Sequence, residues 1–145
     1  MHENDLQPLC NRLRGERCSC VIRSGRTIRL FRQRGVRDLY QLLRDEPEFL
    51  RGALVADKVV GKGAAALMIL GGVEALHAGV LSEPARDLLV AAGVETHCDT
   101  LVPHIVNRSQ TDRCPLEKRC DAAATATECL PLIEAFIATL PPQTT

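Results

Sequence analysis

The chain has no tryptophan, one tyrosine and three phenylalanines, and its apolar residues never form a long uninterrupted run. A transmembrane helix needs roughly 18 or more consecutive apolar residues, so this composition excludes a membrane class. The opening residues MHENDLQPLC have neither a basic start nor an apolar signal core. We therefore expect a cytoplasmic globular protein that has no membrane partner.

Arginine is concentrated at one end, although the net charge is zero. Residues 1–52 contain eleven arginines and seven acids, whereas the remainder contains seven basic residues and eleven acids. Clustered cations suit contact with nucleic-acid phosphates. Single-strand binding also depends on aromatic stacking, and this chain has few aromatic side chains, namely Phe31, Tyr40, Phe49 and Phe136. A solvated or subunit-facing surface is therefore favoured over nucleic-acid binding.

The seven cysteines lack the spacing of a metal site. Cys18 and Cys20 are two apart, Cys114 and Cys120 are six apart, and no Cys-x-x-Cys pair exists. An odd number of cysteines without a secretion signal favours reduced thiols over a disulfide framework. We predict neither a metal site nor a cofactor.

Hydrophobic periodicity predicts alternating helices and strands. A tight turn at Ser24 and Gly25 joins two short strands into a hairpin. Ser82 is placed to cap a helix that Gly93 ends. The expected helices cover residues 4–15, 35–46, 63–70, 82–93, 114–120 and 130–140, and the expected strands cover 18–23, 27–32, 53–56, 73–81 and 94–102.

This alternation predicts an α/β fold, a three-layer α/β/α sandwich with a partly parallel sheet. The length of 145 residues suits a single domain over 1–145, with a helix within 1–16 and a frayed tail at 141–145. In such sheets, ligands commonly bind where the end of a strand leads into the start of the next helix. The segment that opens the helix at 63–70 and the segment VLSEPA are two such junctions, which we expect side by side.

Three segments carry a family resemblance: GVRDLYQLL, ALVADKVVGKGAAALMILGGVEALHAGVLSEPARDLLVAAGV and LVPHIVNRSQTDRCPLEK. Over about residues 18 to 140 the chain resembles a small prokaryotic family of unknown function assigned to the cytidine-deaminase-like fold. The resemblance implies a mixed five-stranded sheet flanked by helices. Zinc deaminases of this fold use His-x-Glu and Pro-Cys-x-x-Cys motifs at two helix starts.

Alignment with those motifs indicates that this chain lacks the zinc site. Val60 stands where the histidine ligand would be, and Lys62 stands where the catalytic glutamate would be. Ala85 and Leu88 occupy the positions of the two cysteine ligands. Apolar side chains cannot donate a lone pair to zinc, so zinc-dependent deamination is not expected.

Lys62 is the candidate anchor for an anionic ligand. The dipole repels a lysine in the first turn of a helix, and a carboxylate or phosphate would relieve that repulsion. A buried ion pair of Lys62 with Asp57 or Glu83 explains the lysine equally well. Strand alternation sends Asp57 and Lys58 to opposite sides, and we favour Asp57 as the residue that faces the pocket.

The neighbouring helix start and a later loop supply further candidates. Ser82 can be explained as a helix cap, and Glu83 as a negative charge at the positive end of the helix dipole. Glu83 could also face Lys62. Asn107 and Arg108 belong to the later loop, together with Cys114.

The sequence CPLEK resembles a capping box, with Cys114 in the cap position, Pro115 in the first helical position and Glu117 in the third. A thiol at a helix start near Arg108 and Arg113 is a setting that activates a nucleophile. An inert, partly buried thiol explains Cys114 too.

A dinucleotide fingerprint is a competing interpretation of residues 61–66. Gly61, Gly63 and Ala66 follow a strand in the pattern G-x-G-x-x-A, with Glu83 about twenty residues later. Close helix packing explains the two glycines more simply.

The residues support three functional hypotheses. The first is a zinc-independent pocket for a small anionic or nucleotide-like ligand, with Lys62 as anchor and Asp57 as base or orienting group; an enzyme would then use Lys62 or Cys114 in group transfer. The second is a non-catalytic ligand-binding or regulatory module, and the third is a scaffold whose arginine-rich hairpin faces a partner or another subunit. By fold analogy alone we also predict a homodimer.

Overall fold

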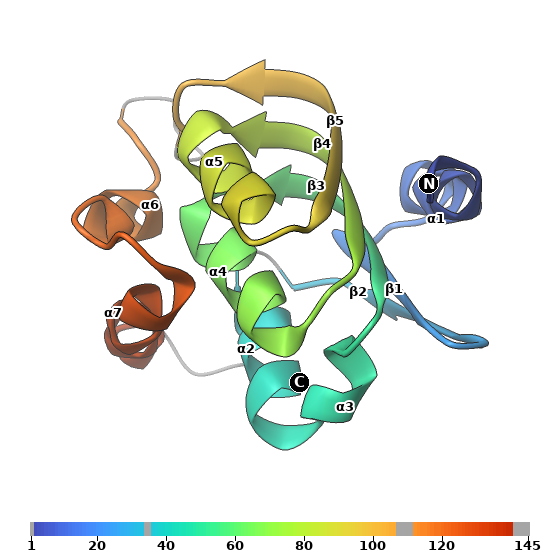
Figure 1. The fold of residues 1–145 in the computed structure, drawn as a ribbon, viewed down its shortest axis with the longest axis horizontal. Helices are drawn as coiled ribbons and strands as arrows, with labels where there is room; N and C mark the ends of the chain where they lie inside the picture. The colour runs from blue at the N-terminus through green and yellow to red at the C-terminus, as the bar shows by residue number, and fades with distance from the viewer. Residues whose placement is uncertain (1, 34–35, 107–111, 141–145) are drawn as a thin grey trace.

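The computed structural model describes residues 2–33, 36–106 and 112–140 (Figure 1). Asn107, Arg108 and the tail at 141–145 therefore lie outside the described residues. In chain order the elements are α1 (Glu3–Gly15), β1 (Cys20–Ser24), β2 (Thr27–Phe31), α2 (Arg37–Asp45), α3 (Pro47–Leu50), β3 (Leu54–Val60), α4 (Lys62–Gly71), β4 (Ala75–Ser82), α5 (Glu83–Ala91), β5 (Glu95–Val102), α6 (Pro115–Cys120) and α7 (Ala126–Ala138).

The strands form one mixed five-stranded sheet in the order β2-β1-β3-β4-β5. The hairpin is antiparallel, with Ser24 opposite Thr27, and β1 also pairs antiparallel with β3. Strands β3, β4 and β5 are parallel because α4 and α5 carry the chain back between them. The predicted α/β class and mixed five-stranded sheet are confirmed.

Helices cover both faces of the sheet, and each face has its own core. Alternation along β3 sends Val55 into the larger core, which includes the apolar helix α4, and sends Leu54 and Ala56 into a smaller core under α1. Figure 1 shows α1 on the opposite side of the sheet from α4 and α5. The larger core lies between the sheet and the helices α2, α4, α5 and α7.

Three local predictions need correction. The strand predicted at 53–56 continues to Val60, because Val59 and Val60 pair with Val80 and Leu81 of β4. The last helix begins at Ala126, where Thr125 caps it by accepting a hydrogen bond from the backbone N–H of Glu128. The short helix α3 was not predicted.

Cys18 and Cys20 do not share a face of the sheet. Cys20 lies in the larger core with Ile22, whereas Cys18 packs into the smaller core under α1. Strand alternation does not apply to Cys18 because β1 begins only at Cys20.

In the described part of the chain, no helix is both long enough and apolar enough to cross a membrane.

Candidate functional site

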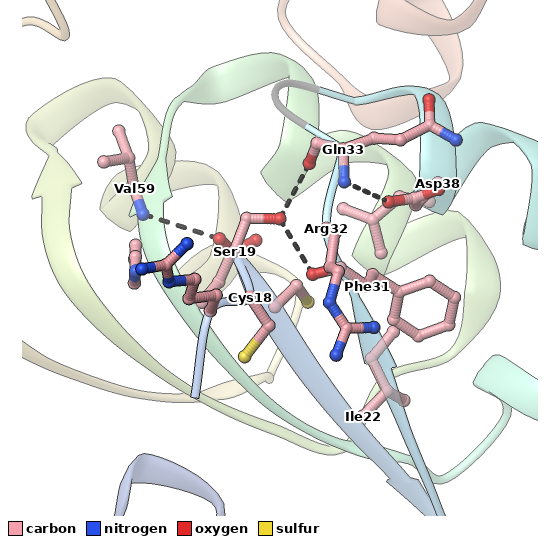
Figure 2. Close-up of a pocket in the computed structure, with 13 residues that line it drawn as sticks. Cys18, Ser19, Ile22, Phe31, Arg32, Gln33, Asp38 and Val59 are labelled. Atoms are coloured by element: carbon pink, nitrogen blue, oxygen red, sulfur yellow. Dashed lines mark hydrogen bonds between the residues drawn. The ribbon is translucent and has the colours of Figure 1, made fainter. Parts of the chain in front are cut away.

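A cavity of about 480 Å³ opens where the start of β1 and the ends of β2 and β3 meet the start of α2 (Figure 2). The antiparallel register brings these segments together, because Cys20 stands opposite Phe31 on one side and Asp57 on the other. Cavities of 300–1,000 Å³ are typical of small-molecule sites. This cavity is therefore the candidate functional site.

Asp57 is the central titratable group of the cavity. Its side chain is only 9% exposed, and burial raises its pKa from 3.8 to about 7, although the backbone N–H groups of Val59 and Lys58 oppose the rise. The N–H of Val59 donates to Asp57 Oδ1 at 3.4 Å. Burial also raises the pKa of the Cys20 thiol, and the charge of Asp57 adds to this effect. Asp57 can accordingly gain or lose a proton near neutral pH.

The wall beside α2 contains a second carboxyl group and is held by local hydrogen bonds. Asp38 accepts the backbone N–H of Gln33 at 3.2 Å, and burial raises the pKa of Asp38 while this bond lowers it. Ser19 Oγ lies 3.1 Å from the carbonyl of Phe31 and 2.7 Å from that of Gln33, and donates toward both (Figure 2). These bonds tie the end of β2 to the segment before β1.

Three cations line the same cavity: Arg17, Arg32 and Lys58. All three side chains are exposed, so they belong to its mouth. In residues 2–33, 36–106 and 112–140, none of the three forms an ion pair with a carboxylate. The mouth is therefore positively charged, and its charge is available to a ligand.

Lys62 lies elsewhere, buried between the start of α4 and the loop that joins α6 to α7. Its Nζ donates to the carbonyl oxygens of Ala123 at 2.6 Å and Asp121 at 3.4 Å. These partners differ from those that the sequence suggested, an external anion or an ion pair with Asp57 or Glu83. The cavity contains Asp57 and Lys58 but not Lys62.

Glu117 fills the junction where the sequence predicted a ligand. Its buried carboxylate accepts the backbone N–H of Lys62 at 2.9 Å, the hydroxyl of Ser82 at 2.5 Å and the backbone N–H of Ile105 at 2.7 Å. The two predicted junctions do lie side by side, because β3 and β4 are paired. An internal carboxylate thus binds at the helix starts, where free N–H groups favour an anion.

The structure also separates Ser82 and Glu83 from the cavity. Ser82 caps α5 as predicted, because its Oγ accepts the N–H of Ala85 at 3.2 Å. Glu83 is exposed at the start of α5.

Cys114 occupies the cap position of α6, but no side-chain cap bond forms there, and Glu117 points to α4 and α5 instead. The predicted capping box is therefore wrong. The guanidinium of Arg113 binds both carboxylate oxygens of Asp121 and not the thiol.

A second hollow, of about 120 Å³, lies under α1 on the other face of the sheet. Lys58 lines both hollows, whereas Asp57 lines the larger one alone. In the smaller one His77 Nε2 lies 3.0 Å from Asp99 Oδ1, an arrangement consistent with a structural histidine. Within the residues that the structure describes, no group of three or more His, Cys, Asp or Glu side chains could hold a metal ion.

Sequence reasoning identified Asp57 and Lys58 but missed the opposite wall of the cavity. Arg17 and Arg32 were visible only as members of the arginine-rich segment, and Asp38 looked like an ordinary charge in the first turn of a helix. Their common location depends on the hairpin pairing with β3, which no local pattern encodes.

The fold and the cavity define a mixed α/β domain with a charged pocket at one edge of its sheet. Residues 9–137 match the TM1506 family, described as a domain of unknown function (DUF1893), and the chain belongs to this family. A crystal structure of a DUF1893 family protein (TM1506) from Thermotoga maritima is similar, with a TM-score of 0.85 and 26% sequence identity over 94% of this chain and 92% of that one. No curated protein matches the chain.

Proposed function

We propose that the cavity at the start of β1 and the ends of β2 and β3 binds a small anionic or nucleotide-like ligand without zinc. The observation that carries this proposal is the group of three cations, Arg17, Arg32 and Lys58, around a pocket of ligand size, none of which forms an ion pair with a carboxylate of the described residues. Cations that no internal carboxylate neutralises attract an anion from solution. Arginine in particular presents a planar fork that suits phosphate and carboxylate groups.

Asp57 is the proposed acid–base group of this site. A carboxyl group with a pKa of about 7 exchanges its proton readily under cellular conditions. Lys62 and Cys114, which the sequence suggested for group transfer, do not line the cavity. Neither residue is therefore proposed to contact the ligand. Of the residues that the sequence suggested, Asp57 and Lys58 are the two that line the cavity.

We also propose that the domain is a cytidine-deaminase-like three-layer sandwich without the zinc site. Helices on both faces of a mixed sheet support the layered arrangement. The apolar residues at the positions of the zinc ligands and the carboxylate of Glu117 at the two helix starts support the loss of the metal.

A thermal-shift screen of nucleotides and sugar phosphates tests the ligand proposal. Binding to the folded state raises the melting temperature, and Arg32→Ala should reduce that rise. Arg26→Ala is the matched control, because Arg26 is an exposed arginine in the turn between β1 and β2 and does not line the cavity. A rise that is unchanged in Arg32→Ala and in Lys58→Ala would remove the cavity from consideration.

A non-catalytic module is the alternative, and thiol labelling separates it from an enzyme that uses Cys114. Cys98 and Cys114 are half-buried, whereas the other five cysteines are buried. Iodoacetamide labelling that favours Cys114 strongly over Cys98 near neutral pH would support a nucleophile. Equal labelling of the two thiols would exclude Cys114 as a nucleophile and leave the binding module and an enzyme that uses Asp57.

Two further proposals follow from the sequence and have simple tests. A homodimer predicts a doubled mass in light scattering. Cytoplasmic location predicts that the protein is recovered with the soluble fraction of its host cells.

A further inference from the structure

We propose that the ligand of this cavity has two different ends, an amine or similar N–H donor that enters toward Asp57 and Asp38, and an anionic group that stays at the mouth with Arg17, Arg32 and Lys58. This inference rests on the proposed function, because it concerns the same cavity. It adds the chemical class of the ligand, an amine-bearing organic anion.

The interior of the cavity favours a hydrogen-bond donor. Asp57 is nearly buried, and the N–H of Val59 makes a long 3.4 Å contact to its Oδ1. The N–H of Lys58 and the thiol of Cys20 also donate toward this carboxyl group. Asp38 accepts the backbone N–H of Gln33 at 3.2 Å and a further hydrogen bond from the side chain of Gln33. The hydroxyl of Ser19 already donates to main-chain carbonyls. An ionised carboxylate has about four acceptor sites, which is more than the donors that reach Asp57 or Asp38, so both groups retain acceptor capacity for a donor that comes from outside.

The mouth favours the opposite charge. Arg17, Arg32 and Lys58 are exposed on three different segments, one before β1, one after β2 and one in β3. Their placement around one opening lets them converge on a single anionic group.

Ligands with only one of these features fit less well. A simple anion drawn fully into the cavity would meet the carboxyl groups of Asp57 and Asp38, and like charges repel. A simple amine would reach those carboxyl groups but leave the three cations of the mouth without a partner. A molecule that carries both groups satisfies both parts of the cavity, and a volume of about 480 Å³ accommodates a phosphorylated sugar.

Three matched probes test the inference on the whole protein by calorimetry. Glucosamine 6-phosphate carries an amine and a phosphate, glucose 6-phosphate replaces the amine by a hydroxyl, and glucosamine lacks the phosphate. We expect glucosamine 6-phosphate to bind about tenfold more tightly than glucose 6-phosphate and than glucosamine, because charge-assisted hydrogen bonds are the stronger class.

Two variants test which group of the ligand lies in the interior of the cavity and which lies at its mouth. Asp57→Asn keeps the shape of the side chain but cannot become an anion, and it should bring the affinity ratio of the two sugar phosphates close to one. Arg32→Ala should weaken both sugar phosphates about tenfold and preserve the ratio. Arg26→Ala should change neither quantity. Circular dichroism of each variant establishes that it is folded.

The outcomes separate the inference from the proposed function. Equal affinities of the two sugar phosphates, both weakened by Arg32→Ala, would overturn the amine preference and leave the anion site standing. A tenfold preference that persists in Asp57→Asn and in Asp38→Asn would overturn the assigned orientation. Failure of both sugar phosphates to bind below about 10 mM would overturn the inference, and the proposed function falls with it when the nucleotides of the thermal-shift screen also give no shift.

Discussion

The carboxylate of Glu117 accepts the backbone N–H of Lys62 at 2.9 Å, while Nζ of Lys62 donates to the carbonyl of Ala123 at 2.6 Å. Each residue thus binds the polypeptide segment of the other, and α4 is joined twice to the chain around α6. Both side chains are buried, so these hydrogen bonds form away from competing water. The start of α4 is consequently a structural junction.

Replacement of Glu117 should destabilise the protein strongly. In Glu117→Gln an amide replaces a carboxylate that accepts three hydrogen bonds, and an amide N–H can face the backbone donors of Lys62 or Ile105. We expect the free energy of unfolding to fall by about 2–4 kcal/mol, measured by urea denaturation. The control Glu83→Gln affects an exposed residue and should cost less than about 1 kcal/mol. Equal effects of the two variants would contradict the structural role of Glu117.

Lys62 and Lys58 should respond in opposite ways to the same substitution. Lys62→Met removes the donor to Ala123 and Asp121, and should lower the free energy of unfolding by about 1–2 kcal/mol without changing ligand affinity. Lys58→Met affects an exposed lysine of the cavity, and should change stability by less than about 0.5 kcal/mol but weaken anion binding. Urea denaturation and calorimetry with glucose 6-phosphate measure the two quantities. Loss of binding in Lys62→Met would instead restore Lys62 as the anchor.

Asp57 should make the protein less stable as the pH rises. The pKa of this carboxyl group is about 7 in the folded protein, against a reference value of 3.8. Between these values the folded state binds the extra proton, so the free energy of unfolding falls as the pH rises from about 4 to 7 and then levels off. The interval corresponds to about 4 kcal/mol at most.

The variant Asp57→Asn isolates this contribution. It should match the parent protein near pH 4 and be more stable by a few kcal/mol near pH 8, because a neutral amide does not become a buried anion. Urea denaturation at several pH values gives both curves. Parallel curves for the two proteins would mean that Asp57 has an ordinary pKa.

Gly63 should tolerate no larger residue, for a reason of packing. A Cβ at this position would lie 2.6 Å from the Cδ2 atom of Leu116, which docks α6 against α4. We expect Gly63→Ala to lower the free energy of unfolding by about 1–3 kcal/mol. Gly15→Ala is the control, because a Cβ there meets nothing within 4 Å. A neutral Gly63→Ala variant would reopen the dinucleotide interpretation of residues 61–66.

The sequence determined the elements and most of their order. Two short segments on either side of a glycine turn were sufficient to predict the hairpin, and the apolar residues of 63–70 were sufficient to predict a helix there. These features depend on neighbours within a few residues, which a local pattern records. The same locality explains the error at β3, where Asp57 and Lys58 interrupt the apolar run although the hydrogen-bonded ladder continues to Val60.

Only the tertiary structure decided which charges meet. Asp57 and Lys58 line one cavity with Arg17, Arg32 and Asp38 because β1 pairs with both β2 and β3, and this pairing joins segments up to 41 residues apart, from Arg17 to Lys58. Lys62 is turned away from them because Glu117, 55 residues later in the chain, binds its backbone. Side-chain partners across such separations depend on strand register and helix docking, and neither leaves a periodic signal in the sequence.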